Sequence, residues 1–152
     1  MTEAVTVLSD ALFHQLQKES FVMLHTIDAE LGIPTSSAIS WVFAADRSTL
    51  RFAVDGRSRL VVNMNANPDV CVTVFSAGTV HAINGKAKLV TEELEDVPFK
   101  LVCFDIGITG IRDAMFYGAR LTIAPEYEKT YDKRAADKLD GQVFAAMKKS
   151  LV

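Results

Sequence analysis

Two arginines and a serine stand together in the run 55–59, Asp-Gly-Arg-Ser-Arg. Asp-Gly has the residue types of a tight turn, an alternating apolar strand precedes it, and residues 60–64 have the apolar spacing of a short helix. A helix that begins with Arg57, Ser58 and Arg59 has the features of an anion-binding site. Its first amide groups, its dipole and the guanidinium groups all attract negative charge. Phosphate fits the forked donors of arginine best. The competing interpretation is a solvated surface triplet.

The overall composition predicts one soluble domain over residues 1–152. Hydrophobic residues make up 49%, the upper edge of ordinary composition, so we expect a buried homodimer interface to cover part of the apolar surface. The net charge is −3, from 16 basic and 19 acidic residues without a basic block, which speaks against a nucleic-acid partner. Arg47, Arg51, Arg57 and Arg59 form the one locally basic cluster.

Cysteines and histidines give no sign of a metal site. Cys71 and Cys103 lie in apolar runs without CxxC spacing and are expected to be buried free thiols in a reducing compartment. His14, His25 and His81 have no ligand-like spacing, so no metal is predicted. Neither a signal peptide nor a membrane-spanning apolar run is evident, and we expect a cytoplasmic protein without membrane contact.

Hydrophobic periodicity predicts a mainly β fold, a β-barrel with appended helices. Strands are expected at 21–27, 35–43, 49–54, 69–75, 79–90 and 114–124, and helices at 10–18, after Arg59, from 91 towards 104 and at 135–151. The first three strands should form an antiparallel meander. Gly85, within the fifth strand, predicts a bulge, and Gly107 and Gly110 are expected to break the chain.

The order of short motifs between Phe21 and Glu92 resembles the FMN-binding split barrel of the pyridoxamine 5′-phosphate oxidase-like family, in its small general-stress-protein-type members. The motifs are Thr26-Ile27-Asp28, Gly32-Ile33-Pro34, Leu50–Val54, Gly56–Arg59, Asn67-Pro68 and Asn84–Leu89. The resemblance implies a six-stranded antiparallel split barrel that forms a homodimer and binds FMN at the subunit interface.

The resemblance also implies a cofactor site. The flavin phosphate would lie against the Arg-Ser-Arg run, and the ring along the second and third strands. The residues implied are Ser37, Ile39, Ala53, Val54, Arg57, Ser58 and Arg59. Leu60 stands where the family oxidase has a lysine, and the basic residues that the oxidase carries near Ser37 and Val42 are absent. We therefore expect a substrate other than pyridoxamine phosphate.

Three functions remain open at this point. The first is an FMN-dependent oxidoreductase whose substrate and catalytic residue are unassigned, because the motif region contains no obvious acid, base or nucleophile. The second is a non-catalytic flavin- or haem-binding protein, with His25 or His81 as the haem ligand. The third is a barrel that has lost its cofactor, for which Leu60 is the best argument.

Overall fold

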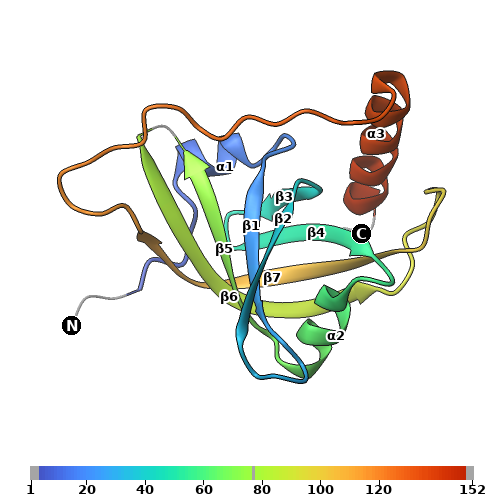
Figure 1. Ribbon diagram of the computed structural model, residues 1–152, viewed down its shortest axis with the longest axis horizontal. Helices are drawn as coiled ribbons and strands as arrows, with labels where there is room; N and C mark the ends of the chain where they lie inside the picture. Colours follow the sequence, from blue (N-terminus) through green and yellow to red (C-terminus); the bar gives the residue numbers. More distant parts are fainter. Residues whose placement is uncertain (1–3, 77, 150–152) are drawn as a thin grey trace.

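Seven antiparallel strands form a single sheet in the computed structural model, which describes residues 4–76 and 78–149 (Figure 1). The strands are β1 (Val22–Ile27), β2 (Pro34–Ile39), β3 (Val42–Asp46), β4 (Thr49–Asp55), β5 (Asp69–Ser76), β6 (Thr79–Thr91) and β7 (Leu101–Asp113). The helices are α1 (Asp10–Gln15), α2 (Arg59–Ala66) and α3 (Lys133–Lys149). The order across the sheet is β2-β1-β5-β6-β7-β4-β3.

The sheet is a split barrel. Its two edge strands, β2 and β3, are consecutive in the chain and joined through Ser40 and Trp41, so the sheet curls until its edges meet at this bend. The mainly β class with appended helices is confirmed. The strand count is seven and not the predicted six, because the expected strand 35–43 is two strands, while the unexpected β7 takes the place of the expected strand 114–124. Inward and outward residues alternate up to Ile39, whereas Val42, Phe43 and Ala44 are buried in succession.

The predicted meander of the first three strands is wrong. β1 and β2 form one hairpin and β3 and β4 form another, but β5, β6 and β7 lie between the two hairpins. The short connections indicated that strands consecutive in the chain would pair with each other. They did not show that the bend after Ile39 carries the chain across the opening of the barrel.

The predicted helix from 91 towards 104 and the predicted strand 114–124 are also wrong. β7 runs straight through Gly107 and Gly110, and residues 114–132 leave the sheet except for a bridge between Gly78 and Leu121. The run Leu101–Phe104 is buried without alternation because the barrel core covers one face of β7 and α3 covers the other. A continuous apolar run of this length fits a doubly buried strand as well as a helix.

Other expected elements are confirmed. Ser9 caps the start of α1, and its Oγ accepts from the Leu12 amide at 3.2 Å. α3 matches the expected closing helix, whose last expected residues lie outside the described part of the chain. The strand pairing shifts at Gly85, as a bulge requires. A side chain there would place its Cβ 2.6 Å from the Gly107 carbonyl oxygen, which explains the glycine.

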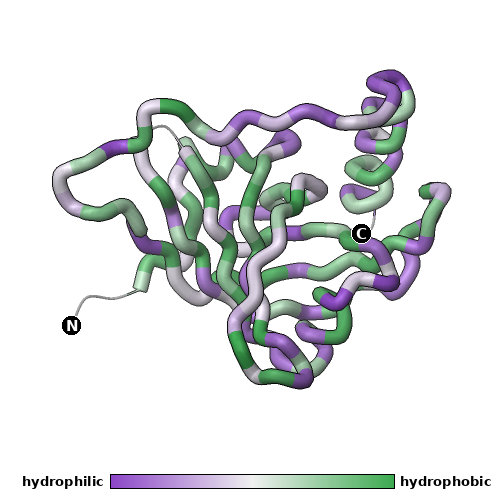
Figure 2. The backbone as a smooth tube through the Cα atoms, in the orientation of Figure 1, coloured by the Kyte–Doolittle hydropathy of each residue, from purple (hydrophilic) through white to green (hydrophobic). Residues whose placement is uncertain are grey.

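The core has two parts, and apolar chain lies both inside the barrel and along α3 (Figure 2). Inside the barrel, the rings of Phe52 and Phe104 stack with centroids 5.7 Å apart. Outside it, Val143 and Met147 of α3 pack against Cys103. Burial raises the pKa of Cys103 to about 12, so this thiol stays protonated. Cys71 is half-buried, and both cysteines are free.

Within residues 4–76 and 78–149, no helix is long and apolar enough to cross a membrane. The same residues contain no cluster of three or more histidine, cysteine or acidic side chains that could hold a metal ion.

Candidate functional site

The opening of the barrel forms a cleft of about 520 Å³ between the ends of β2 and β4. We call it the seam cleft. Its lining residues are Ser37, Ala38, Ile39, Ser40, Trp41, Ala53, Val54, Asp55, Ser58, Leu60, Lys129 and Tyr131. Two strand ends, the first turn of α2 and a distant C-terminal segment thus meet at one place.

Sheet topology leaves backbone groups without strand partners at this cleft. Among the described strands β2 pairs with β1 alone, and the last backbone bond of β4 on the β3 side is the Ala53 amide donating to the Trp41 carbonyl at 3.0 Å. Backbone groups on the free edge of β2 and at the end of β4 therefore have no strand partner across the seam. Ile39, Val54 and Leu60 add apolar walls.

A smaller cavity of about 180 Å³ lies at the start of α2. We call it the anion pocket. It is lined by Asp28, Thr35, Ser37, Ser58, Arg59, Leu60 and Asn63. Because Ser37, Ser58 and Leu60 line both cavities, the seam cleft and the anion pocket are adjacent along one path.

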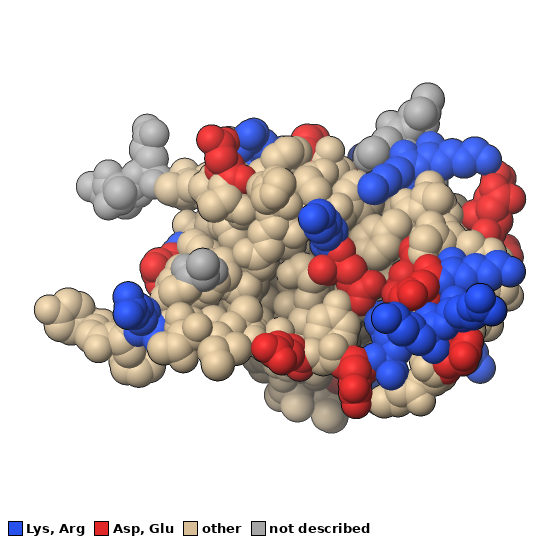
Figure 3. Space-filling view, turned by 90° about the horizontal axis from the view of Figure 1, so that it is seen from above, with Lys and Arg blue, Asp and Glu red and all other residues tan. Residues whose placement is uncertain are grey.

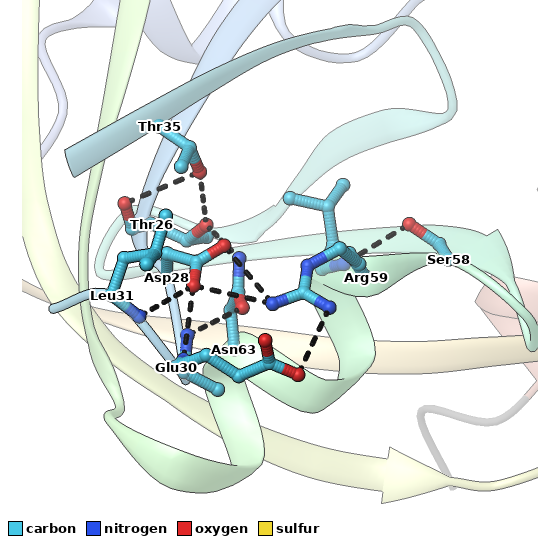
Figure 4. Close-up of polar contacts among 10 residues, drawn as sticks. Thr26, Asp28, Glu30, Leu31, Thr35, Ser58, Arg59 and Asn63 are labelled. Carbon is cyan, nitrogen blue, oxygen red and sulfur yellow. Dashed lines mark hydrogen bonds and ion pairs between the residues drawn. The ribbon is translucent and has the colours of Figure 1, made fainter. Parts of the chain in front are cut away.

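Two polar side chains fix the start of α2 at this pocket (Figure 4). Ser58 caps the helix, its Oγ accepting from the Leu60 amide at 3.1 Å. Asn63, which is buried, donates to Thr26 Oγ1 at 3.1 Å and accepts from the Ala29 amide at 2.9 Å. α2 is thereby tied to the β1–β2 hairpin, and the positive end of its dipole faces the pocket.

Arg59 is held by a carboxylate. Its Nη2 lies 3.1 and 3.2 Å from the two oxygens of Asp28, and its Nη1 lies 3.8 Å from Glu30 (Figure 4). Amides of Leu31 and Glu30 donate to Asp28 and lower its pKa, and Arg59 lowers it further. Asp28 thus stays ionised at neutral pH, and an anion entering the pocket must compete with it for Arg59.

Arg57 lies elsewhere. Its side chain is 92% exposed and pairs with Asp55, with Nε 3.1 Å from Oδ1. It lines neither the seam cleft nor the anion pocket. Of the Arg-Ser-Arg run, the structure brings Ser58 and Arg59 to the pocket, and a cofactor contact by Arg57 stays a prediction.

The residues expected along the flavin ring do come together. Ser37, Ile39, Ala53 and Val54 all line the seam cleft, and their contact with a cofactor stays a prediction. Leu60 is 6% exposed and packs in the barrel core, so it contributes an apolar wall and not a charge.

Sequence reasoning missed Trp41, Lys129 and Tyr131. Strand alternation does place Trp41 on the same side as Ile39, and that signal could have identified it. Lys129 and Tyr131 come from an irregular segment without a local motif, so no sequence signal pointed to them.

The histidines lie away from the cleft. His25 Nδ1 is 2.8 Å from Ser36 Oγ, and its Nε2 is 2.8 Å from Thr73 Oγ1. Both ring nitrogens are therefore engaged. Neither His25 nor His81 is among the described residues that line the seam cleft.

The fold and the motif region agree with known proteins. Among solved structures, a candidate pyridoxamine 5′-phosphate oxidase from Lactobacillus delbrueckii has a TM-score of 0.61 at 17% identity, covering 71% of this chain and 95% of that one. General stress protein 26 from Bacillus anthracis has a TM-score of 0.56 at 16% identity, covering 68% and 91%. HutZ, described as a haem storage protein from Vibrio cholerae, has a TM-score of 0.53 at 14% identity, covering 66% and 89%.

Identities this low establish the shared fold alone, and no curated protein matches the chain. The family model described as pyridoxamine 5′-phosphate oxidase matches residues 8–107, about two thirds of the sequence. This chain therefore belongs to the pyridoxamine 5′-phosphate oxidase family, as the order of its motifs indicated.

Proposed function

We propose that this chain binds FMN in the seam cleft and acts as a flavin-dependent oxidoreductase on a substrate other than pyridoxamine 5′-phosphate. One observation carries the proposal: a largely apolar cleft continues into a pocket with Ser58, Arg59 and the start of α2. An apolar cleft followed by a pocket with hydrogen-bond donors matches a flat heterocycle that bears a phosphate on a short chain.

The residues present fit that group. The cleft volume of about 520 Å³ lies in the usual range for small-molecule sites, roughly 300–1,000 Å³. Trp41, Ile39 and Val54 offer flat and apolar contacts to the ring, while Ser58 and Arg59 offer donors to the phosphate. When bound, the flavin supplies the redox chemistry, and the chain holds the ring and keeps water from it.

The single tryptophan gives a test at the site itself, because Trp41 lines the cleft. FMN titrated into the protein should quench Trp41 fluorescence and give a yellow complex with visible flavin bands. Riboflavin should bind at least about tenfold more weakly, since it cannot use the charged hydrogen bonds of the anion pocket. Trp41→Phe should retain flavin and lose the signal. Absent quenching, or equal affinities for the two flavins, would contradict the proposal.

We also propose that the protein is a cytoplasmic homodimer. Leu31 and Ile33, in the β1–β2 hairpin, are exposed apolar residues near the anion pocket, and β2 has a free edge. A partner that covers this edge would close the site from outside. The two free thiols fit a reducing compartment. Light scattering at micromolar concentration should give twice the chain mass of 16.7 kDa, and a monomer would contradict a site shared between subunits.

The second candidate function is that of a non-catalytic protein that binds flavin or haem. The likeness to the V. cholerae haem storage protein is the observation that favours haem. Against haem, His25 is engaged at both ring nitrogens, and no histidine of the described chain lines the cleft. A Soret band after haem titration, with flavin left unbound, would favour this candidate. Flavin that binds but accepts no electrons from any donor would indicate a non-catalytic role.

A further inference from the structure

Residues 126–132, which we call the strap, run from the side of the barrel to the start of α3 along the top of the view in Figure 1. The strap lies beyond the family-matched residues 8–107. The Tyr127 hydroxyl donates to Glu19 Oε1 at 2.6 Å, and its ring lies 5.7 Å from that of Phe21. The strap is thus fixed to the chain just before β1.

Lys129 is the central residue of the strap. Its Nζ lies 2.9 Å from Glu19 Oε1 and 3.3 Å from Asp140 Oδ2. Burial lowers the pKa of Lys129, but the hydrogen bonds and charges of Glu19 and Asp140 outweigh burial and raise it, so the ammonium stays charged at neutral pH. Asp140 Oδ1, at 3.4 Å, and the centroid of the Tyr127 ring, at 5.7 Å, also lie near Nζ, so Lys129 acts on a ligand through its charge.

The strap places this ammonium at a defined part of the site. Lys129 and Tyr131 line the seam cleft but not the anion pocket, so they lie towards the ring end of the path. Lys129 is the only cationic residue among the described residues that line the cleft. Asp140 also accepts from Trp41 Nε1 at 2.8 Å, which fixes Lys129 relative to the cleft wall.

The charges around Lys129 are mixed. Figure 3, which views the strap side of the molecule, shows basic and acidic side chains close together over the part where α3 lies. Glu19 and Asp140 are about one fifth exposed or less, and they face Lys129 from the segment before β1 and from α3. Removing any of the three charges therefore changes the electrostatic potential in the cleft. The change is negative when the charge of Lys129 is removed and positive when that of Glu19 or Asp140 is removed.

We propose that Lys129 sets the redox preference of the bound cofactor by favouring the reduced, anionic flavin over the oxidised, neutral one. The proposal rests on the proposed flavin function and deepens it. Oxidised flavin offers neutral carbonyl and nitrogen acceptors, and reduction adds negative charge to the ring. A fixed ammonium at the ring end stabilises the second state more than the first.

The test compares FMN-loaded wild type, Lys129→Met, Lys129→Arg and, as a control at an exposed lysine, Lys133→Met. Midpoint potentials come from equilibration with a reference dye, and affinities for oxidised FMN from Trp41 quenching. In Lys129→Met, the preference of the site for reduced over oxidised flavin should fall about tenfold. The midpoint potential of the bound flavin should then be about 30 mV more negative, for a two-electron couple. Lys129→Arg should restore most of the potential, and Lys133→Met should match wild type.

Glu19→Gln provides a change of opposite sign. It removes a negative charge next to Lys129, so the potential should become less negative although the strap loses an ionic contact. A strap with a merely structural role would change affinity in both variants and leave the potential where it was, and this outcome overturns the inference alone. A wild-type chain that takes up no FMN overturns the proposed function together with the inference.

Discussion

Arg51→Ala should lower the free energy of unfolding by about 3 kcal/mol, the lower end of the usual cost of removing one partner of a buried ion pair, because Asp105 is 24% exposed. Arg51, on β4, is 5% exposed. Its Nε and Nη2 donate to the two carboxylate oxygens of Asp105, on β7, at 2.7 and 2.9 Å. Its Nη1 donates to the Met147 carbonyl of α3 at 3.0 Å. Alanine leaves this carboxylate and the helix carbonyl without their donor.

Urea unfolding followed by circular dichroism measures the change. Arg51→Met keeps most of the packing but not the donors, so it should also destabilise the protein. Lys149→Ala is the matched control, because Lys149 and Asp96 form an exposed pair at 3.3 Å, a class that contributes at most about 1 kcal/mol. If Arg51→Ala costs no more than this control, Arg51 does not join α3 to the barrel.

Arg51 shows where sequence reasoning reached its limit. In the sequence it belongs to a locally basic cluster with Arg47, Arg57 and Arg59. In the structure it is buried against a carboxylate 54 residues away, whereas Arg57 faces solvent. Sequence spacing alone cannot identify such a partner, because the pairing depends on which strands become neighbours.

Local chemistry was predictable where one short segment contains all of it. The short helix after Ser58 and the bulge at Gly85 depend on residues within a few positions, and the sequence indicated both. The strand β7 was not predictable in this way, because its continuous apolar run reflects layers on both faces. The same reasoning applies to the site: Ser58 and Arg59 came from a local run, whereas Lys129 reaches the cleft from 70 residues further along the chain.

Arg59→Ala should weaken FMN binding by about 1.5–3 kcal/mol, the scale of hydrogen bonds to a charged group, or roughly ten- to 150-fold in Kd. Arg59 reaches the anion pocket from the first turn of α2, whereas riboflavin has no phosphate for it to hold, so riboflavin affinity should hardly change. Arg57→Ala should weaken FMN binding less than Arg59→Ala does, because the Arg57 side chain faces solvent and pairs with Asp55. Trp41 quenching measures all four affinities.

Asp28 supplies the complementary change, because its carboxylate occupies the guanidinium of Arg59 in the structure. Asp28→Asn removes the competing charge while its side-chain oxygen can still accept from the amides of Glu30 and Leu31, so FMN should bind more tightly. The gain should shrink when Arg59→Ala is added, since Asp28→Asn can then act only by removing the repulsion between its carboxylate and the phosphate. Circular dichroism must show each variant folded. Unchanged FMN affinity in a folded Arg57→Ala/Arg59→Ala protein would show that the phosphate does not lie at the start of α2.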